Sequence, residues 1–355
     1  MPFIQHVETA DAPYRVTQQE TVEVVRELFG NSFSDIDRLL KVFGNGQIES
    51  RFLAAPLSWF QQNHDFEEKN QLYIKQALTL GSEAVMRCLQ ETNTSKEEID
   101  AFFFISSSGM ATPTIDARIM NELNFPSHIK RIPIWGLGCA GGASALSRAH
   151  EYLLAYPSAK VLVLCLELCS LTFQRDDTSK SNLIGTSLFA DGAACVLMTG
   201  EKVKHKNTCP RTIDTMSTLM PYSEDVMGWD IKNEGLHVIF SRDIPAIIEE
   251  WLKPNVTAFL KKLDKSSADI DHFVAHPGGK KVLQAYERAL GFSEEKTEPA
   301  REVLAVQGNM SSPTVLYVLK KIMQKKPSYG ENGIVTALGP GFSSELLWLE
   351  WGEKE

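Results

Sequence analysis

The chain has 355 residues, of which 43% are hydrophobic and 23% charged, and it carries a formal net charge of −9. This composition is that of a globular protein and excludes a disordered chain or a coiled coil, while the length is sufficient for two domains or two related halves. The negative charge argues against binding to nucleic acid. No signal-peptide pattern and no apolar run of about 18 residues is present, so we expect a cytoplasmic protein without membrane insertion.

Apolar periodicity predicts helices and strands that alternate along the chain. Helices are expected over residues 17–29, 34–43, 66–90, 244–263 and 314–323. Buried strands are expected at residues 102–105, 161–166, 193–198, 273–275 and 334–338. The segment 200–233 is rich in Lys, Thr, Met and Trp, and we expect it to be an irregular link with a loop over the site. This order of elements is typical of a layered α/β fold.

Three sequence signals occur twice, in the same order. The pairs are Ile99-Asp100 with Ile270-Asp271, Gly138-Cys139 with Gly308-Asn309, and Phe189–Leu197 with Leu338–Leu347. A repeated order of this kind indicates a duplicated α/β unit. We therefore expect an N-terminal half, residues 1–210, and a C-terminal half, residues 211–355, which meet at a pseudo-twofold axis.

Cys139 is the first candidate for a catalytic residue. An apolar run precedes it and a helix of small residues follows, so it is expected at a strand-to-helix turn, where the helix dipole favours the thiolate. The flanking Gly138 and Gly141-Gly142 have no Cβ and are expected to let a substrate approach the sulfur. Taken alone, a buried structural cysteine is an equally good interpretation. The six cysteines have no spacing typical of zinc or of a disulfide framework, so we expect free thiols and no metal.

The duplication predicts two partners for this cysteine. Asn309 occupies the turn equivalent to that of Cys139, and His276 follows the equivalent strand of the second half. Matching turns converge at a symmetry axis, so the three side chains are expected to face one cavity. There they would form a thiolate–imidazolium pair beside an amide that stabilises an oxyanion. Separately, a histidine bonded to the backbone and an ordinary capping asparagine remain alternatives.

These motifs carry a family resemblance. Gly138-Cys139-Ala-Gly-Gly, Phe189-Ala-Asp-Gly-Ala, His276-Pro-Gly-Gly, Gly308-Asn309-Met-Ser-Ser and Gly339-Pro-Gly-Phe resemble the type III polyketide synthases, the chalcone-synthase-like group. The resemblance implies an αβαβα thiolase fold, a homodimer and a Cys139-His276-Asn309 triad. It also implies decarboxylative Claisen condensation of malonyl-CoA onto an acyl-CoA starter, without a metal or another cofactor.

The same resemblance assigns further residues. Phe189 matches an aromatic gate, and Val238 falls where the plant enzymes have a second gating aromatic. Thr112 matches a residue that reaches into the cavity of the partner subunit. Positions that resemble the cavity lining are Ser107, Thr112, Glu167, Cys169, Thr172 and Ser311, with Trp229 placed only loosely. Positions that resemble CoA contacts are Arg38 and Lys41, where the third member of the family's basic trio falls on Asn45. Apart from the resemblance, Lys280 and Lys281 after the His276 turn are expected to add positive charge for the CoA phosphates, and a solvated helix start is an equally good interpretation of them.

The aliphatic Val238 and the small Cys169, Thr172 and Ser311 favour a long fatty acyl starter and alkylpyrone products. A single-round condensing enzyme of the ketoacyl synthase III type is the nearest alternative, and it would add one unit rather than several. A non-catalytic dimer module and a Cys–His hydrolase are the other classes considered. The starter, the number of extensions and the mode of ring closure do not follow from the sequence.

Overall fold

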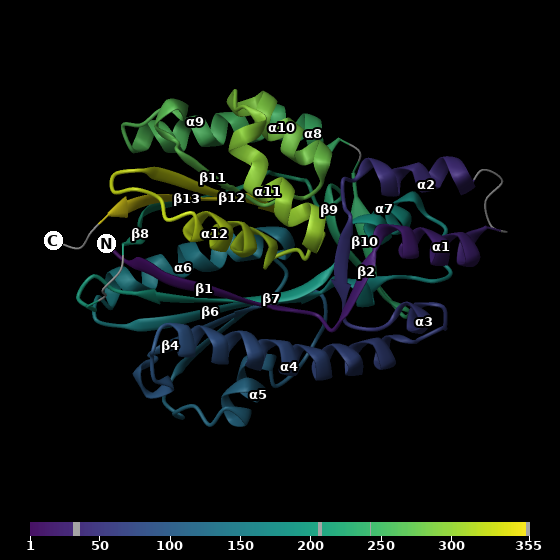
Figure 1. Cartoon of the computed structure of the whole chain (residues 1–355), viewed down its shortest axis with the longest axis horizontal. Coiled ribbons are helices and arrows are strands. Elements are labelled where there is room, and N and C mark those ends of the chain that lie inside the picture. Colours follow the sequence, from purple (N-terminus) through teal and green to yellow (C-terminus); the bar gives the residue numbers. More distant parts are fainter. Residues whose placement is uncertain (31–35, 205–207, 242, 353–355) are drawn as a thin grey trace.

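The computed structural model describes residues 1–30, 36–204, 208–241 and 243–352 (Figure 1). Within these residues one mixed sheet has the strand order β11-β12-β13-β8-β1-β7-β6-β4-β5. The strands are β1 (Phe3–Asp11), β4 (Ala101–Ile105), β5 (Lys130–Ile134), β6 (Lys160–Leu168), β7 (Asp191–Thr199), β8 (Cys209–Leu219), β11 (His272–Ala275), β12 (Asn332–Gly339) and β13 (Ser343–Gly352). The strands of the two sequence halves meet where β8 pairs with β1, at Phe3 and Arg211.

Helices cover both faces of the sheet and separate its two parts (Figure 1). The helices are α1 (Gln18–Phe29), α2 (Ile36–Asn45), α3 (Leu57–Phe60), α4 (Phe66–Glu91), α5 (Ile115–Glu122), α6 (Gly141–Ala155), α7 (Lys180–Leu188), α8 (Ile244–Ile247), α9 (Lys253–Lys262), α10 (Lys280–Leu290), α11 (Glu294–Gln307) and α12 (Thr314–Gln324). Helices α4 and α5 lie outside the N-terminal strands, α6 and α12 lie between the two parts, and α9 to α11 lie outside the C-terminal strands. These five layers confirm the expected layered α/β architecture.

The position of β6 and β7 between two cores explains why their sequences are continuously apolar. Alternate residues belong to different cores: Leu162 and Leu164 pack in the core beneath α4, while Val161 and Val163 pack in the core that contains α6 and α12. Because both faces of these strands are buried, neither face is polar. The runs predicted at residues 161–166 and 193–198 are therefore confirmed as central strands.

The predicted duplication is visible in the local structure. A 3₁₀ turn with a capping box precedes β4 at Lys96–Glu98 and β11 at Ser267–Asp269. The turns that carry Cys139 and Asn309 precede α6 and α12, the two helices between the sheet parts. Equivalent segments of the sequence thus occupy equivalent places in the fold.

The expectation of an irregular segment over residues 200–233 is wrong. This segment contains all of β8 and also β9 (Met227–Lys232), which forms a separate two-stranded sheet with β10 (Gly235–Phe240). Strand β8 has few fully buried positions and pairs along its whole length with β13, the last strand of the chain. Its pairing therefore depends on residues more than 120 positions away, and no local apolar pattern predicts the strand.

The helix predicted over residues 244–263 is present but not uniform. Between α8 and α9 the chain forms a π-helical turn over Ile248–Leu252. Pro254 has no N–H with which to continue the regular bonding pattern, which accounts for the wider turn. The helix predicted at 34–43 begins in residues outside those described, and its described part is α2. A two-stranded ribbon of β2 (Tyr14–Thr17) and β3 (Ser50–Leu53) joins the first helices to the sheet. No helix in the described ranges is long and apolar enough to span a membrane.

Candidate active site

Cys139 lies at the expected strand-to-helix turn. Strand β5 ends at Ile134, a 3₁₀ turn covers Gly138–Ala140, and α6 begins at Gly141. The Ser107 hydroxyl accepts hydrogen bonds from the N–H groups of Gly136, at 3.1 Å, and Gly138, at 3.2 Å. Ser107, which was expected in the cavity lining, therefore shapes the turn that presents the thiol.

The glycines around Cys139 allow close packing within the protein. A Cβ on Gly138, which has φ +46°, would lie 2.8 Å from Pro340 Cδ. A Cβ on Gly142 would lie 2.3 Å from the carbonyl oxygen of Ser312. The absent side chains allow α6 to pack directly against the C-terminal half, and Gly138 also lines a cavity next to Cys139.

Asn309 and Ser311 lie at the thiol. Both side chains act on the thiol, since each lowers the pKa of Cys139 against the larger effect of burial. The Asn309 backbone is fixed on both sides, because its N–H donates to Leu188 O at 2.8 Å and its carbonyl accepts from Ala190 N at 2.9 Å. The Asn309 amide also donates to the carbonyl of Gly278, at 3.3 Å, and so ties this turn to the one that follows His276.

His276 follows β11, as expected, and its side chain is 2% exposed. Its backbone N–H continues the sheet by donating to Thr336 O at 2.8 Å. Within the described ranges, neither ring nitrogen has a hydrogen-bond partner. The alternative of a ring satisfied by the backbone therefore does not hold, and both nitrogens are available for a substrate or for proton transfer.

Burial determines the charge state of this site. It raises the pKa of Cys139 to about 12, with a smaller contribution of the same sign from Glu167, and it lowers the pKa of His276 to about 3. The free protein accordingly holds a thiol and a neutral imidazole. The expectation of a resting thiolate is thus not supported, because desolvation of the buried sulfur outweighs the helix terminus.

Glu167 lies beneath the site as a buried acceptor that connects the two halves. One oxygen, Oε2, accepts from the N–H groups of Ser107 and Ser108, each at 2.9 Å, and from the Ser108 hydroxyl at 2.7 Å. The other, Oε1, accepts from the Ser312 hydroxyl of the C-terminal half at 2.9 Å. Burial raises the pKa of Glu167 to about 7. Its contacts assign it to the support of the site rather than to the cavity wall.

A small cavity lies next to Cys139, and we call it the thiol cavity. Its volume of about 20 Å³ is close to what one water molecule needs. The Phe189 ring packs against Trp229 and Phe240 of the β9–β10 hairpin, with centroids 5.6 Å apart in both pairs. The lining of the thiol cavity includes Cys139, Phe189, Trp229, Val238, Phe240 and Ser311. Phe240 was not identified from the sequence, since it lies on β10, between the irregular segment expected at 200–233 and the helix expected at 244–263, where no element was predicted.

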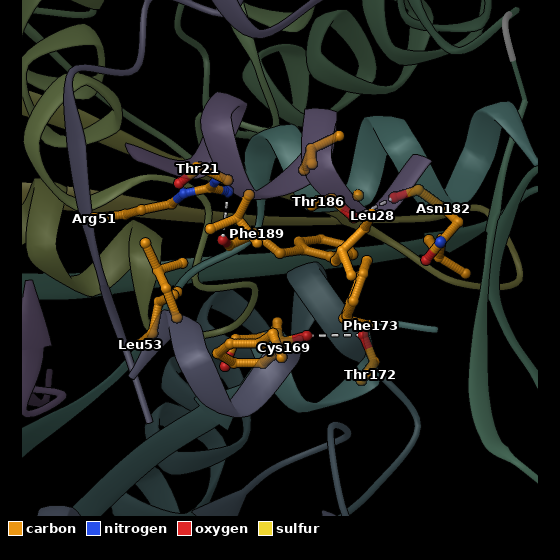
Figure 2. A pocket seen from close by; sticks show the side chains of 17 residues that line it. Thr21, Leu28, Arg51, Leu53, Cys169, Thr172, Phe173, Asn182, Thr186 and Phe189 are labelled. Carbon is orange, nitrogen blue, oxygen red and sulfur yellow. Dashed lines mark hydrogen bonds between the residues drawn. The ribbon is translucent and has the colours of Figure 1, made fainter. Parts of the chain in front are cut away.

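A second cavity of about 60 Å³, the side pocket, shares Phe189 and Val238 with the thiol cavity. Cys169 and Thr172 line it, so the residues expected in one cavity are divided between two (Figure 2). Helix α1 supplies one wall through Thr21, Val24, Val25 and Leu28. This wall was missed because α1 reads as an ordinary amphipathic helix, and its distance from Cys139 in sequence gives no signal of proximity.

The remaining predicted residues lie at the surface. Thr112 is exposed and precedes a cis peptide bond to Pro113, and it lines neither cavity. Arg38 and Lys41 are exposed on α2, while Lys280 and Lys281 begin α10. The two helices lie on the same side of Phe189, because the neighbouring Leu188 is within 4 Å of where a Cβ would lie on Gly46, just after α2, and on Gly279, just before α10.

Comparisons with known proteins agree with this geometry. Residues 55–202 match the family model of chalcone and stilbene synthases, N-terminal domain, and residues 212–350 match that of the C-terminal domain. A putative chalcone synthase of Bacillus subtilis is 52% identical, with 99% of each chain covered. A polyketide synthase-like protein of α-pyrone synthesis from Mycobacterium tuberculosis is 29% identical, over 94% of this chain and 87% of that one.

Solved structures extend the similarity to the whole fold. The 1,3,6,8-tetrahydroxynaphthalene synthase of Streptomyces coelicolor, a bacterial type III polyketide synthase, superposes with a TM-score of 0.93 at 27% identity and covers 99% of both chains. A polyketide synthase from the brown alga Ectocarpus siliculosus superposes with a TM-score of 0.92 at 26% identity, over 99% of this chain and 98% of that one. The chain therefore belongs to the chalcone and stilbene synthase family and is a type III polyketide synthase, an acyltransferase that condenses malonyl-CoA.

Proposed function

We propose that this enzyme carries a long-chain fatty acyl starter on Cys139, extends it repeatedly with malonyl-CoA, and releases alkylpyrone or phenolic products. The observation that carries the proposal is the side pocket, an apolar space that adjoins the thiol cavity at Phe189 and Val238. The names of relatives support both product types, since they include an α-pyrone synthesis protein, tetrahydroxynaphthalene synthases and a phloroglucinol synthase.

Loading begins with the neutral pair that burial maintains. The imidazole of His276 accepts the proton of Cys139, and the sulfur attacks the thioester carbonyl of the starter. The bond between that carbonyl and the CoA sulfur breaks, and CoA leaves with the proton from His276. Proton transfer at the moment of attack avoids a thiolate in the free enzyme, where burial disfavours it.

Condensation uses His276 and Asn309 as the two donors. A hydrogen on the His276 ring and the amide of Asn309 bind the thioester oxygen of malonyl-CoA, and loss of CO₂ leaves an enolate whose charge these donors stabilise. The enolate carbon attacks the acyl-Cys139 carbonyl, the bond to the sulfur breaks, and the thiolate of Cys139 is released with a β-ketoacyl-CoA. The unpartnered ring nitrogens of His276 support this assignment.

The character of the side pocket supports an aliphatic starter. Most of its polar side chains are already satisfied by the protein: the hydroxyl of Thr172 donates to Cys169 O at 2.7 Å, and that of Thr186 donates to Asn182 O at 2.7 Å (Figure 2). Aliphatic and aromatic groups supply most of the remaining wall. Trp229 and Phe240 crowd the thiol cavity itself, so a long chain has to extend past Phe189.

CoA binding and the dimer form part of the same proposal. Arg38 and Lys41 on α2 and Lys280 and Lys281 on α10 lie on the gate side and suit the phosphates of CoA. A homodimer would use the face where Thr112 is exposed and where Trp135 is 50% exposed, an unusual exposure for tryptophan. In that arrangement Thr112 would reach the cavity of the partner subunit.

The test is to incubate the protein with malonyl-CoA and acyl-CoA starters of increasing chain length, together with aromatic starters, and to identify products by mass spectrometry. We expect pyrones or phenols from two or more extensions of long aliphatic starters. The variant Val24→Phe narrows the side pocket and should reduce turnover of long starters while short starters, the internal control, are unaffected. Turnover of aromatic starters only would contradict the proposed starter, and products with one added unit would indicate a single-round enzyme.

A further inference from the structure

We propose that Arg51 is a positioning residue that holds Asn309 and Phe189 in their catalytic places. The inference rests on the function proposed above, because it concerns the geometry of the same site. No sequence motif identified Arg51. The residue lies on β3, in the wall of the side pocket, with its guanidinium directed toward Phe189 (Figure 2).

The environment of Arg51 is unusual for a cation. The residue is 2% exposed, and within the described residues it forms no ion pair. Among the residues that the structure describes, its side chain makes one hydrogen bond, from Nη1 to the carbonyl oxygen of Phe189 at 2.9 Å, and Nε has no partner. The carboxylate of Asp191 favours the Arg51 cation electrostatically, but it accepts its hydrogen bonds from Ala54 N at 2.6 Å and from Ser170 N at 2.7 Å.

A buried charge with one neutral acceptor is costly to fold. Burial lowers the pKa of Arg51 to about 10, so the side chain is still a cation at neutral pH. A charged donor fixes a carbonyl more firmly than a neutral one does, and the rigid guanidinium fixes its direction as well. The carbonyl that Arg51 holds is therefore the feature to examine.

That carbonyl belongs to the segment that fixes Asn309. Phe189 forms an isolated parallel bridge with Asn309, made by the hydrogen bonds from Asn309 N to Leu188 O and from Ala190 N to Asn309 O. The ring of Phe189 lies between the thiol cavity and the side pocket. One peptide segment thus orients both the proposed gate and the proposed oxyanion donor, and Arg51 fixes this segment through its hydrogen bond to the Phe189 carbonyl.

Arg51 is itself anchored to the helix that leads to Asn309. The N–H of Glu49 donates to Ala305 O at 2.8 Å, and the hydroxyl of Ser50 donates to Val306 O at 3.2 Å, both at the end of α11. Gly308, directly after α11, packs closely against Arg51 and Ala190: a Cβ there would lie 3.2 Å from Arg51 Cβ and 3.1 Å from Ala190 Cβ. The contacts therefore form a closed circuit around the Asn309 amide. They run from α11 to β3, from Arg51 on β3 to Phe189, and from Phe189 to Asn309, which follows α11.

The test compares two half-reactions that depend differently on Asn309. Decarboxylation of malonyl-CoA, measured in a Cys139→Ala background, needs the two donors but not the sulfur. Acyl loading, measured as single-turnover release of CoA from a hexanoyl-CoA starter, needs the sulfur and its base. We expect Arg51→Lys to lower decarboxylation by about 10- to 100-fold, because a displacement of the order of 1 Å has effects of that size. Loading should change by less than about 3-fold.

Two further variants complete the design. Arg51→Met removes the donor and should lower decarboxylation further, and if it does not fold, the Lys variant decides the result alone. Arg15→Met is the matched control, because Arg15 donates to Ser50 Oγ on the same strand, at 3.1 Å, without touching Phe189. Equal losses in both half-reactions, or no loss in Arg51→Lys, would overturn the inference. Absence of decarboxylation with Arg51 intact would instead overturn the proposed function.

Discussion

Glu167 makes a prediction about how the stability of the enzyme depends on pH. Replacing it by glutamine keeps the shape of the side chain and removes its charge. The glutamine oxygen can accept the hydrogen bonds that Oε2 now accepts from Ser107 N, Ser108 N and the Ser108 hydroxyl. The glutamine amide then faces the hydroxyl of Ser312, which can accept in place of donating.

The magnitude follows from the pKa of Glu167, which burial raises from 4.5 to about 7. Between these two pKa values the folded chain binds more protons than the unfolded chain, so the free energy of unfolding falls as the pH rises from about 4.5 to about 7. Above about pH 7 the destabilisation caused by the ionised Glu167 has reached its full size. A difference of this size corresponds to about 3 kcal/mol. At pH 5 this destabilisation is less than about 1 kcal/mol.

Urea denaturation at pH 5 and pH 8 measures the effect. We expect Glu167→Gln to be more stable than the parent chain by about 3 kcal/mol at pH 8 and to differ by less than about 1 kcal/mol at pH 5. Activity need not follow stability, since the variant alters the support of the Cys139 turn. A variant with the same pH dependence as the parent chain, or one destabilised at pH 8, would refute the reasoning from burial.

Two other predictions test the packing and the resting charge state. Gly142→Ala should lower the free energy of unfolding by about 1–3 kcal/mol in urea, because its Cβ would meet the carbonyl of Ser312 at 2.3 Å. Gly44→Ala, where a Cβ meets no atom within 4 Å, is its control and should be neutral or slightly stabilising. Iodoacetamide should alkylate Cys139 slowly at pH 7, with a rate that rises about tenfold per pH unit through pH 9, because only the thiolate reacts and burial raises its pKa to about 12. A fast rate that is constant between pH 6 and pH 8 would instead reveal a preformed thiolate–imidazolium pair.

The sequence was most informative where a signal was repeated. The paired turns around Cys139 and Asn309 predicted that two residues 170 positions apart would share a site, and in the structure Asn309 lowers the pKa of the Cys139 thiol against the larger effect of burial. The long helix expected over 66–90 is α4, Phe66–Glu91, because its capping residues and apolar face are both local signals. Strands buried on both faces were also recognisable, since their apolar runs are continuous.

The features that were missed depend on contacts distant in sequence. Strand β8 acquires its pairing from β13, and α1 becomes a wall of the side pocket only in the folded chain. The role of Gly142 requires knowing that Ser312 lies against it. The charge state of Cys139 requires knowing how completely the sulfur is buried, which a helix start in the sequence does not reveal.

The central claim is that Cys139 carries the growing chain, and mass spectrometry of the enzyme during turnover tests it most directly. The protein would be mixed with hexanoyl-CoA and malonyl-CoA, quenched in acid and digested, and the cysteine peptides weighed. The account predicts an acyl group on the peptide that contains Cys139, with no adduct in Cys139→Ala. Continued product formation with acyl groups on another cysteine, or with none, would contradict it.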